Sequence, residues 1–157
     1  MHSVELLPDD RLDAHVRALW RRLREAGLPS LARHPHPTNR PHLTVLTASA
    51  ITDAPDLPLP VAAELGAVTL LGRALVLEVT PTDELRAIHA ECWSALAAAE
   101  PWPGPGEWVP HVSLALNVPP PQRETALAVL GDVAPARGQF VAARSYDTRS
   151  RTVTDLP

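Results

Sequence analysis

The same succession of elements occurs twice along this chain, and this repeat constrains the fold more than any other feature of the sequence. In each half a short apolar strand leads through a proline and an acidic residue into an amphipathic helix, and a proline-rich loop then leads into another strand. The first strand and helix are predicted at residues 4–7 and 10–26, and their counterparts at residues 74–80 and 85–99. A repeated strand, helix and strand predicts two lobes of similar shape.

The remaining segments complete what we expect to be a single domain, residues 1–157. Residues 61–65 are predicted to form a short helical turn, and residues 67–71 a strand that pairs with 74–80. A third helix is expected from the prolines at 119–121 to Gly131, with two further strands near 138–145 and 150–154. We expect lobe one to comprise about residues 1–60 with the C-terminal strands, and lobe two about residues 61–136.

Each half ends in a histidine strand of the same pattern. The two tetrads are His42-Leu43-Thr44-Val45 and His111-Val112-Ser113-Leu114, and a proline precedes both. Because side chains alternate between the faces of a strand, the imidazole and hydroxyl of each tetrad share one face, and the apolar pair anchors the other. Polar strand residues that only satisfy hydrogen bonds are the ordinary interpretation of one such tetrad. Its occurrence twice, each time after proline, favours a symmetric reactive site.

Two imidazoles on opposite sides of a reacting atom suit in-line displacement at phosphorus. One ring accepts the proton of the attacking oxygen and the other donates a proton to the leaving oxygen, which histidine can do near neutral pH. The neighbouring hydroxyls would donate hydrogen bonds to the non-bridging phosphate oxygens. Such a site would work without a metal.

At these residues the chain resembles the 2H phosphoesterase superfamily, which includes the 2′-5′ RNA ligase and cyclic nucleotide phosphodiesterase families and is defined by two His-x-Ser/Thr-x motifs. The resemblance implies a bilobal α+β fold with two antiparallel sheets around a central cleft and a pseudo-twofold axis. It also implies that His42 and His111 are the general acid and base, and that Thr44 and Ser113 bind the substrate phosphate.

We therefore expect a metal-independent cyclic phosphodiesterase, a hydrolase without cofactor that opens 2′,3′-cyclic phosphates of nucleotides or RNA ends. In ring opening we assign His111 to activate water and His42 to protonate the leaving oxygen. One alternative with the same chemistry is a 2′-5′ RNA ligase that acts on tRNA halves. The other is a non-catalytic protein that binds phosphorylated nucleotides.

Five further residues are candidate substrate contacts. The two tryptophans among them could stack on a base or belong to the core. The late arginine could hold a second phosphate or lie on the surface as most arginines do. The five are Arg40, Trp102, Trp108, Arg144 and Tyr146.

Other histidines offer weaker sites. His89 and Glu91 match the start of a zinc deaminase motif, but the two further cysteines of that motif are absent because Cys92 is the only cysteine. Packing in a helix is the better interpretation of His89. A metal cluster of His34, His36 and His42 lacks a nearby acid, and we expect no metal.

Composition narrows the function classes. The chain contains no lysine, which excludes Schiff-base chemistry and a Walker phosphate loop, and its net charge of −4 disfavours a broad nucleic-acid surface. Both ends are mildly basic around an acidic middle, which suits a small phosphate-bearing ligand or an RNA end. One cysteine permits no internal disulfide, and no apolar run reaches the roughly 18 residues of a membrane span. We expect a cytoplasmic monomer with no membrane partner, and a composition rich in alanine, arginine and proline suggests a bacterial source.

Overall fold

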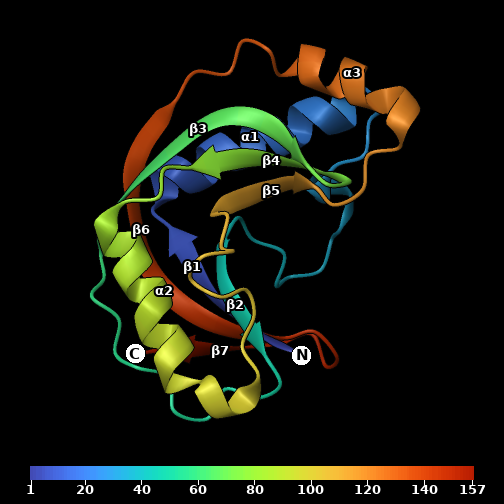
Figure 1. The fold of residues 1–157 in the computed structure, drawn as a ribbon. Coiled ribbons are helices and arrows are strands. Elements are labelled where there is room, and N and C mark those ends of the chain that lie inside the picture. Colours follow the sequence, from blue (N-terminus) through green and yellow to red (C-terminus); the bar gives the residue numbers. More distant parts are fainter.

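The protein is described from a computed structural model that covers all 157 residues. Three α-helices and two short 3-10 helices accompany seven strands. Figure 1 shows how they are arranged. The helices are α1 (Asp10–Glu25), η1 (Leu31–Arg33), α2 (Asp83–Ala95), η2 (Ala97–Ala99) and α3 (Pro120–Val129). The strands are β1 (His2–Pro8), β2 (Leu43–Ala48), β3 (Val61–Leu71), β4 (Ala74–Val79), β5 (His111–Ala115), β6 (Ala136–Asp147) and β7 (Thr152–Leu156).

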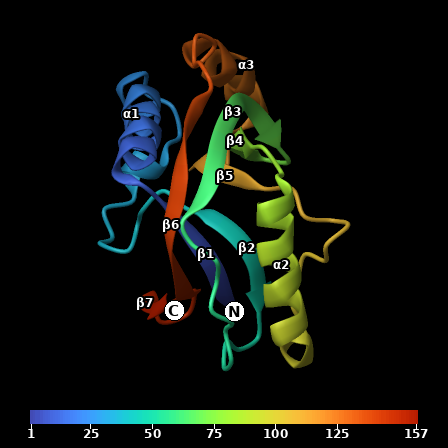
Figure 2. The ribbon, with the colours of Figure 1, turned by 90° about the vertical axis from the view of Figure 1, so that its left-hand side faces the viewer.

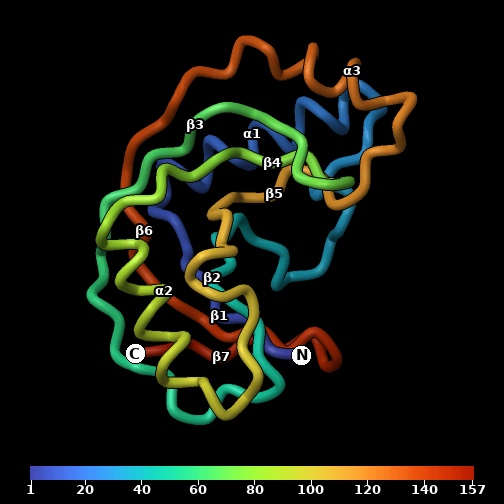
Figure 3. The backbone as a smooth tube through the Cα atoms, in the orientation of Figure 1, coloured from blue at the N-terminus to red at the C-terminus, as the bar shows by residue number.

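The seven strands form one antiparallel sheet in the order β1-β2-β5-β4-β3-β6-β7, and β1 also pairs with β6. The long strand β6 makes this second pairing possible. Its residues 136–140 pair with β3, and its residues 140–147 pair with β1. The backbone trace in Figure 3 can be followed along β6 past both neighbours. The strand pairings from β1 through β2, β5, β4, β3 and β6 therefore form a closed ring.

This arrangement differs from the two separate sheets that we expected. Hydrogen bonds join the strands of both repeats because β6 belongs to both sets, and because β2 of the first repeat pairs with β5 of the second. The fold is thus a mixed one of helices and a single seven-stranded antiparallel sheet.

The two long helices begin in the same way. Asp9 accepts a hydrogen bond from the backbone of Leu12 at the start of α1, and Thr82 accepts one from Leu85 at the start of α2. Each helix buries one stripe of apolar side chains, but the helices pack on different strands: α1 contacts β1, β5 and β6, whereas α2 contacts β2. Figure 2 shows them on opposite sides of the strands. None of the helices is sufficiently long and apolar to span a bilayer.

Most sequence predictions of these elements are confirmed, and one is wrong. Both repeats contain the predicted strand and helix, and Gly27 ends the α1 region with a positive φ of 76°. Residues 61–65, however, are the first half of β3 and not a helical turn. Alanine and glutamate favour a helix there, but Val61, Ala63 and Leu65 alternate toward the core and pair with β6, so tertiary contacts decide the structure.

Candidate active site

The two tetrads lie side by side at the point where the repeats meet. Leu43 of β2 pairs with Val112 of β5 in an antiparallel register. When this register is continued by one residue in each direction, each histidine is opposite the hydroxyl residue of the other tetrad: His42 opposite Ser113, and His111 opposite Thr44. All four are half-buried, whereas Leu43 and Val112 are buried on the other face. One polar surface thus carries both imidazoles and both hydroxyls.

The two imidazoles are oriented by the same local contact. The Nδ1 atom of His42 lies 2.7 Å from the carbonyl oxygen of Arg40, and that of His111 lies 2.7 Å from the carbonyl oxygen of Val109. A carbonyl oxygen can only accept, so Nδ1 carries the proton in both rings. The remaining nitrogen, Nε2, is therefore available in each ring to accept or donate a proton.

A tryptophan supports each hydroxyl residue from behind. The indole N–H of Trp108 donates to the carbonyl oxygen of Thr44 at 3.2 Å, and that of Trp20 donates to the carbonyl oxygen of Ser113 at 3.1 Å. Both tryptophans are buried, so Trp108 belongs to the core, which is one of the two interpretations of this residue. Trp20 was not singled out from the sequence, although its position four residues after Val16 places it on the buried stripe of α1.

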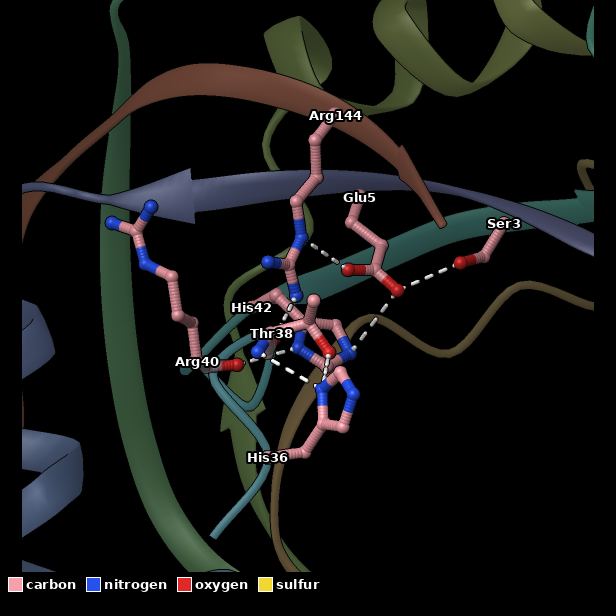
Figure 4. Close-up of polar contacts among 7 residues, drawn as sticks. All are labelled: Ser3, Glu5, His36, Thr38, Arg40, His42 and Arg144. Carbon is pink, nitrogen blue, oxygen red and sulfur yellow. Dashed lines mark hydrogen bonds and ion pairs between the residues drawn. The ribbon is translucent and has the colours of Figure 1, made fainter. Parts of the chain in front are cut away.

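A buried carboxylate adjoins only one of the two histidines. Glu5 of β1 is 3% exposed, and its Oε2 lies 3.6 Å from Nε2 of His42. The Arg144 guanidinium donates to Oε1 at 2.8 Å and the Ser3 hydroxyl to Oε2 at 2.7 Å, as Figure 4 shows. Arg144 and the carboxylate thus satisfy each other, as buried ions require. Sheet register explains the cluster, because β1 places Glu5 opposite both Thr44 and Arg144.

The same arginine holds the segment that leads to His42. Nη2 of Arg144 donates to the carbonyl oxygen of Thr38 at 2.9 Å, and the Thr38 hydroxyl lies 2.6 Å from Nδ1 of His36. Arg144 is 4% exposed, so it is neither the surface residue nor the free phosphate ligand that the sequence suggested. Its buried partner Glu5 escaped sequence analysis, although a charged residue within an otherwise apolar strand was the signal that could have revealed it.

The other predicted contacts are dispersed. Trp102 is 61% exposed beside β2, to which it is joined by a bridge with Thr47. Arg40 contributes its carbonyl to His42, and its guanidinium is directed away from that imidazole in Figure 4. Tyr146 is half-buried on β6, opposite Ser3. No hydrogen bond or ion pair joins these three residues to one another.

His89 is a buried packing residue. It stacks on Trp108 with ring centroids 4.7 Å apart, and its Nε2 donates to the Pro103 carbonyl oxygen at 2.9 Å. Burial lowers the pKa of His89 below its ordinary value of 6.5, and the hydrogen bond to Pro103 offsets part of that effect. No group of three or more histidine, cysteine, aspartate or glutamate residues is arranged to hold a metal ion, the histidines at 34, 36 and 42 included.

Comparisons with known proteins agree with this fold. The PDE domain of MHV ns2 superposes with a TM-score of 0.59 at 15% sequence identity, over 99% of this chain and 98% of that one. A solved phosphoesterase gives a TM-score of 0.57 at 12% identity, over 99% and 93% of the two chains. No match was found among curated proteins. The family model of the 2′-5′ RNA ligase superfamily matches residues 8–146, which include both tetrads, and the chain therefore belongs to this superfamily of 2H phosphoesterases.

Proposed function

We propose that this protein is a metal-independent phosphodiesterase that opens 2′,3′-cyclic phosphates of nucleotides or RNA ends. Membership of the superfamily suggests phosphodiesterase- or ligase-type chemistry. The observation that carries the proposal is the β2-β5 register, which sets two histidines beside two hydroxyls on one polar surface, with Nδ1 and not Nε2 of each ring bound to a backbone carbonyl. Two such imidazoles supply the acid and the base that displacement at phosphorus requires.

In the proposed reaction His111 is the base and His42 is the acid. A water oxygen attacks phosphorus and loses its proton to Nε2 of His111, while the bond from phosphorus to one ribose oxygen breaks. That oxygen takes a proton from Nε2 of His42, and the product is a phosphate monoester. The geometry distinguishes the two histidines, because a carboxylate oxygen of Glu5 lies 3.6 Å from Nε2 of His42, whereas no ion pair is formed by His111.

Thr44 and Ser113 are proposed to bind the non-bridging oxygens of the phosphate. Each hydroxyl lies on the same strand face as the histidine of its own tetrad and opposite the histidine of the other. Hydrogen bonds from these hydroxyls would stabilise the charge that develops on those oxygens. The indole bonds from Trp20 and Trp108 hold the backbone of both residues and so limit the movement of the hydroxyls.

The finer architecture is part of the same proposal. We infer that residues 1–157 form one domain with two pseudo-symmetric lobes, the first of about residues 1–60 with the C-terminal strands and the second of about residues 61–136. The matching helix caps and the matching histidine contacts support this symmetry. The proposed cleft lies where β2 and β5 meet.

The function is tested by incubating purified protein with EDTA and a panel of 2′,3′-cyclic nucleotides. We expect turnover in EDTA and a single monoester product, which phosphorus NMR identifies as the 2′ or the 3′ isomer. A parallel reaction contains RNA with a cyclic phosphate end and RNA with a 5′-hydroxyl end. Joined RNA without hydrolysis would indicate a ligase, and binding without any product would overturn the enzymatic proposal.

A further inference from the structure

A basic cavity of about 300 Å³ lies between α1 and the segment that precedes the first tetrad. Arginines on successive turns of α1 and two histidines of the loop line this cavity. None of the lining residues carries a carboxylate. Its volume lies at the lower end of the roughly 300–1,000 Å³ of small-ligand sites. The basic residues are Arg17, Arg21, Arg24, His34 and His36.

Two of these arginines have no anionic partner. Arg17 is bound to Asp13 at 2.6 Å and lies over the Trp20 ring, with its guanidinium carbon 5.7 Å from the ring centroid. Arg21 and Arg24 are exposed and make no ion pair. Like charges three and four residues apart on a helix repel each other, so this spacing costs stability unless an anion is bound. In a chain of net charge −4 such a concentration of positive charge is a local feature.

Two lining residues of the cavity are connected by hydrogen bonds to the candidate active site. Trp20 lines its wall, and the indole of the same residue donates to the carbonyl oxygen of Ser113 in the second tetrad. His36 lies at its other edge and is linked through Thr38 and Arg144 to Glu5 beside His42, a chain of contacts visible in Figure 4. The lining of the cavity is therefore joined to both tetrads, to the second through Trp20 and to the first through the segment that leads to His42, as a ligand that reaches from the cavity to the tetrads would require.

We propose that this cavity binds a second phosphate ester of the substrate, one that takes no part in the reaction. The inference rests on the proposed function for the identity of the reacting phosphate. It makes the preferred substrate a molecule with at least two phosphates, because the guanidinium groups of Arg21 and Arg24 are suited to phosphate oxygens. The second phosphate is either a diester in an RNA chain or a 5′-monoester of a nucleotide.

Three substrates with the same cyclic end distinguish these sources. They are a nucleoside 2′,3′-cyclic phosphate, the same compound with a 5′-phosphate, and a dinucleotide with a cyclic phosphate end. We expect kcat/KM to be higher for one of the last two, chiefly through KM. The Arg21→Ala/Arg24→Ala double variant should lose about two- to fivefold of that advantage for each arginine. A preference for the 5′-phosphate assigns the monoester, and a preference for the dinucleotide assigns the diester.

A binding measurement separates this proposal from the proposed reaction. A short single-stranded RNA with a 3′-hydroxyl has no reacting phosphate, and its affinity is measured by fluorescence anisotropy across a series of salt concentrations. A 5′-phosphorylated nucleoside competes in the same assay. We expect the double variant to bind one of these probes about tenfold more weakly. For RNA, the slope of log affinity against log salt should also become shallower by roughly 0.7 for each phosphate that the variant no longer neutralises.

The matched control is Arg11→Ala/Arg149→Ala, which removes two exposed arginines outside the cavity and changes the net charge equally. Equal binding and equal substrate preference in the double variant and the wild type would overturn the second-phosphate site. Equal losses in the two double variants would also overturn it, because net charge alone would then explain the effect. If the wild type hydrolyses no cyclic phosphate but the cavity variant still loses RNA binding, the proposed reaction fails and the binding site stands.

Discussion

Glu5 and Glu78 occupy equivalent positions in the two repeats, each three residues before the proline that precedes a helix, yet their surroundings differ. Glu5 is buried, bound to Arg144 and 3.6 Å from the nearer ring nitrogen of His42. Glu78 is exposed, lies opposite His111 in the β4-β5 register and makes no ion pair. Two nearly identical histidine strands are therefore placed in different electrostatic environments.

Each glutamate lies on a strand that pairs with a histidine strand on one side and with a further strand on the other. The difference arises from this further strand. β1 is flanked by β6, which places Arg144 opposite Glu5. β4 is flanked by β3, and there the register shifts between Leu65 and Val68, so that Gly66 and Ala67 adjoin Glu78 in place of a cation. The repeated sequence thus builds a repeated backbone, while the unrepeated strand β6 distinguishes the two halves of the site. This asymmetry is the basis on which we propose different roles for the two imidazoles.

Loss of either histidine tests the roles most strongly. We expect His42→Ala and His111→Ala each to lower kcat on a cyclic nucleotide by about 10²- to 10⁴-fold, because each removes a proton acceptor or donor from the transition state. Steady-state kinetics on folded protein, checked by circular dichroism, measure this. A diester whose p-nitrophenolate leaves without protonation should restore turnover to the His42 variant and not to the His111 variant. If turnover returned in both variants, or in the His111 variant alone, the assignment of His42 as acid and His111 as base would be rejected.

Removal of a hydroxyl should have a smaller effect. Thr44→Ala and Ser113→Ala are each expected to reduce kcat by about 10- to 100-fold, because one hydrogen bond to the phosphate is lost while both imidazoles remain. The conservative changes Thr44→Ser and Ser113→Thr retain the hydroxyl and should retain most of the activity. Full activity in the alanine variants would show that the hydroxyls do not contact the phosphate.

The two glutamates are compared directly by Glu5→Gln and Glu78→Gln. Glu5→Gln leaves Arg144 buried without a negative charge, so we expect it to lower the free energy of unfolding by about 2 kcal/mol. Glu78→Gln should change it by less than about 0.5 kcal/mol, as is usual for an exposed site. Urea denaturation measures both values.

The Glu5→Gln variant also has a spectroscopic readout, which a purely structural role of Glu5 would not produce. In a nitrogen-detected NMR spectrum, Glu5→Gln should shift the imidazole resonances of His42 and leave those of His111 in place. Equal shifts in both rings, or none, would mean that the carboxylate does not distinguish the two histidines.

Acid should lower the stability of the protein, because each of the two long helices carries a histidine whose pKa is lowered by burial. His89 of α2 packs on Trp108, which supports Thr44 of the first tetrad. Burial lowers the pKa of folded His89 below 6.5, so the unfolded chain binds more protons as the pH falls below that value. Stability is therefore complete above about pH 6.5 and decreases below it, by at most about 1.4 kcal/mol per pH unit for one histidine.

Thermal unfolding between pH 7.5 and 5.5 measures this decrease. His15 contributes in the same direction, because burial also lowers its pKa. The His89→Gln variant should therefore retain part of the pH dependence and lose the remainder. An unchanged profile in this variant would remove His89 from the explanation.

Several parts of the fold could be predicted because they depend on neighbours in sequence. Helix starts at Asp9 and Thr82 follow from side chains that cap the first turn. The sharing of one face by His42 and Thr44 follows from the alternation of side chains along a strand. Residues 61–65 form a strand and not the expected helical turn, because Val61 pairs with Phe140, which belongs to a strand far along the chain.

The sequence by itself determined the repeated elements, the two tetrads and the face on which each tetrad presents its imidazole and hydroxyl, because these properties arise from local backbone geometry. Only the tertiary structure decided that Leu43 pairs with Val112, that β6 joins all strands into one sheet, and that Glu5 and Arg144 lie beside one histidine. Those contacts join residues far apart in sequence, and their register depends on how the whole sheet packs. The asymmetry between His42 and His111 is therefore a property of the folded protein and not of its repeats.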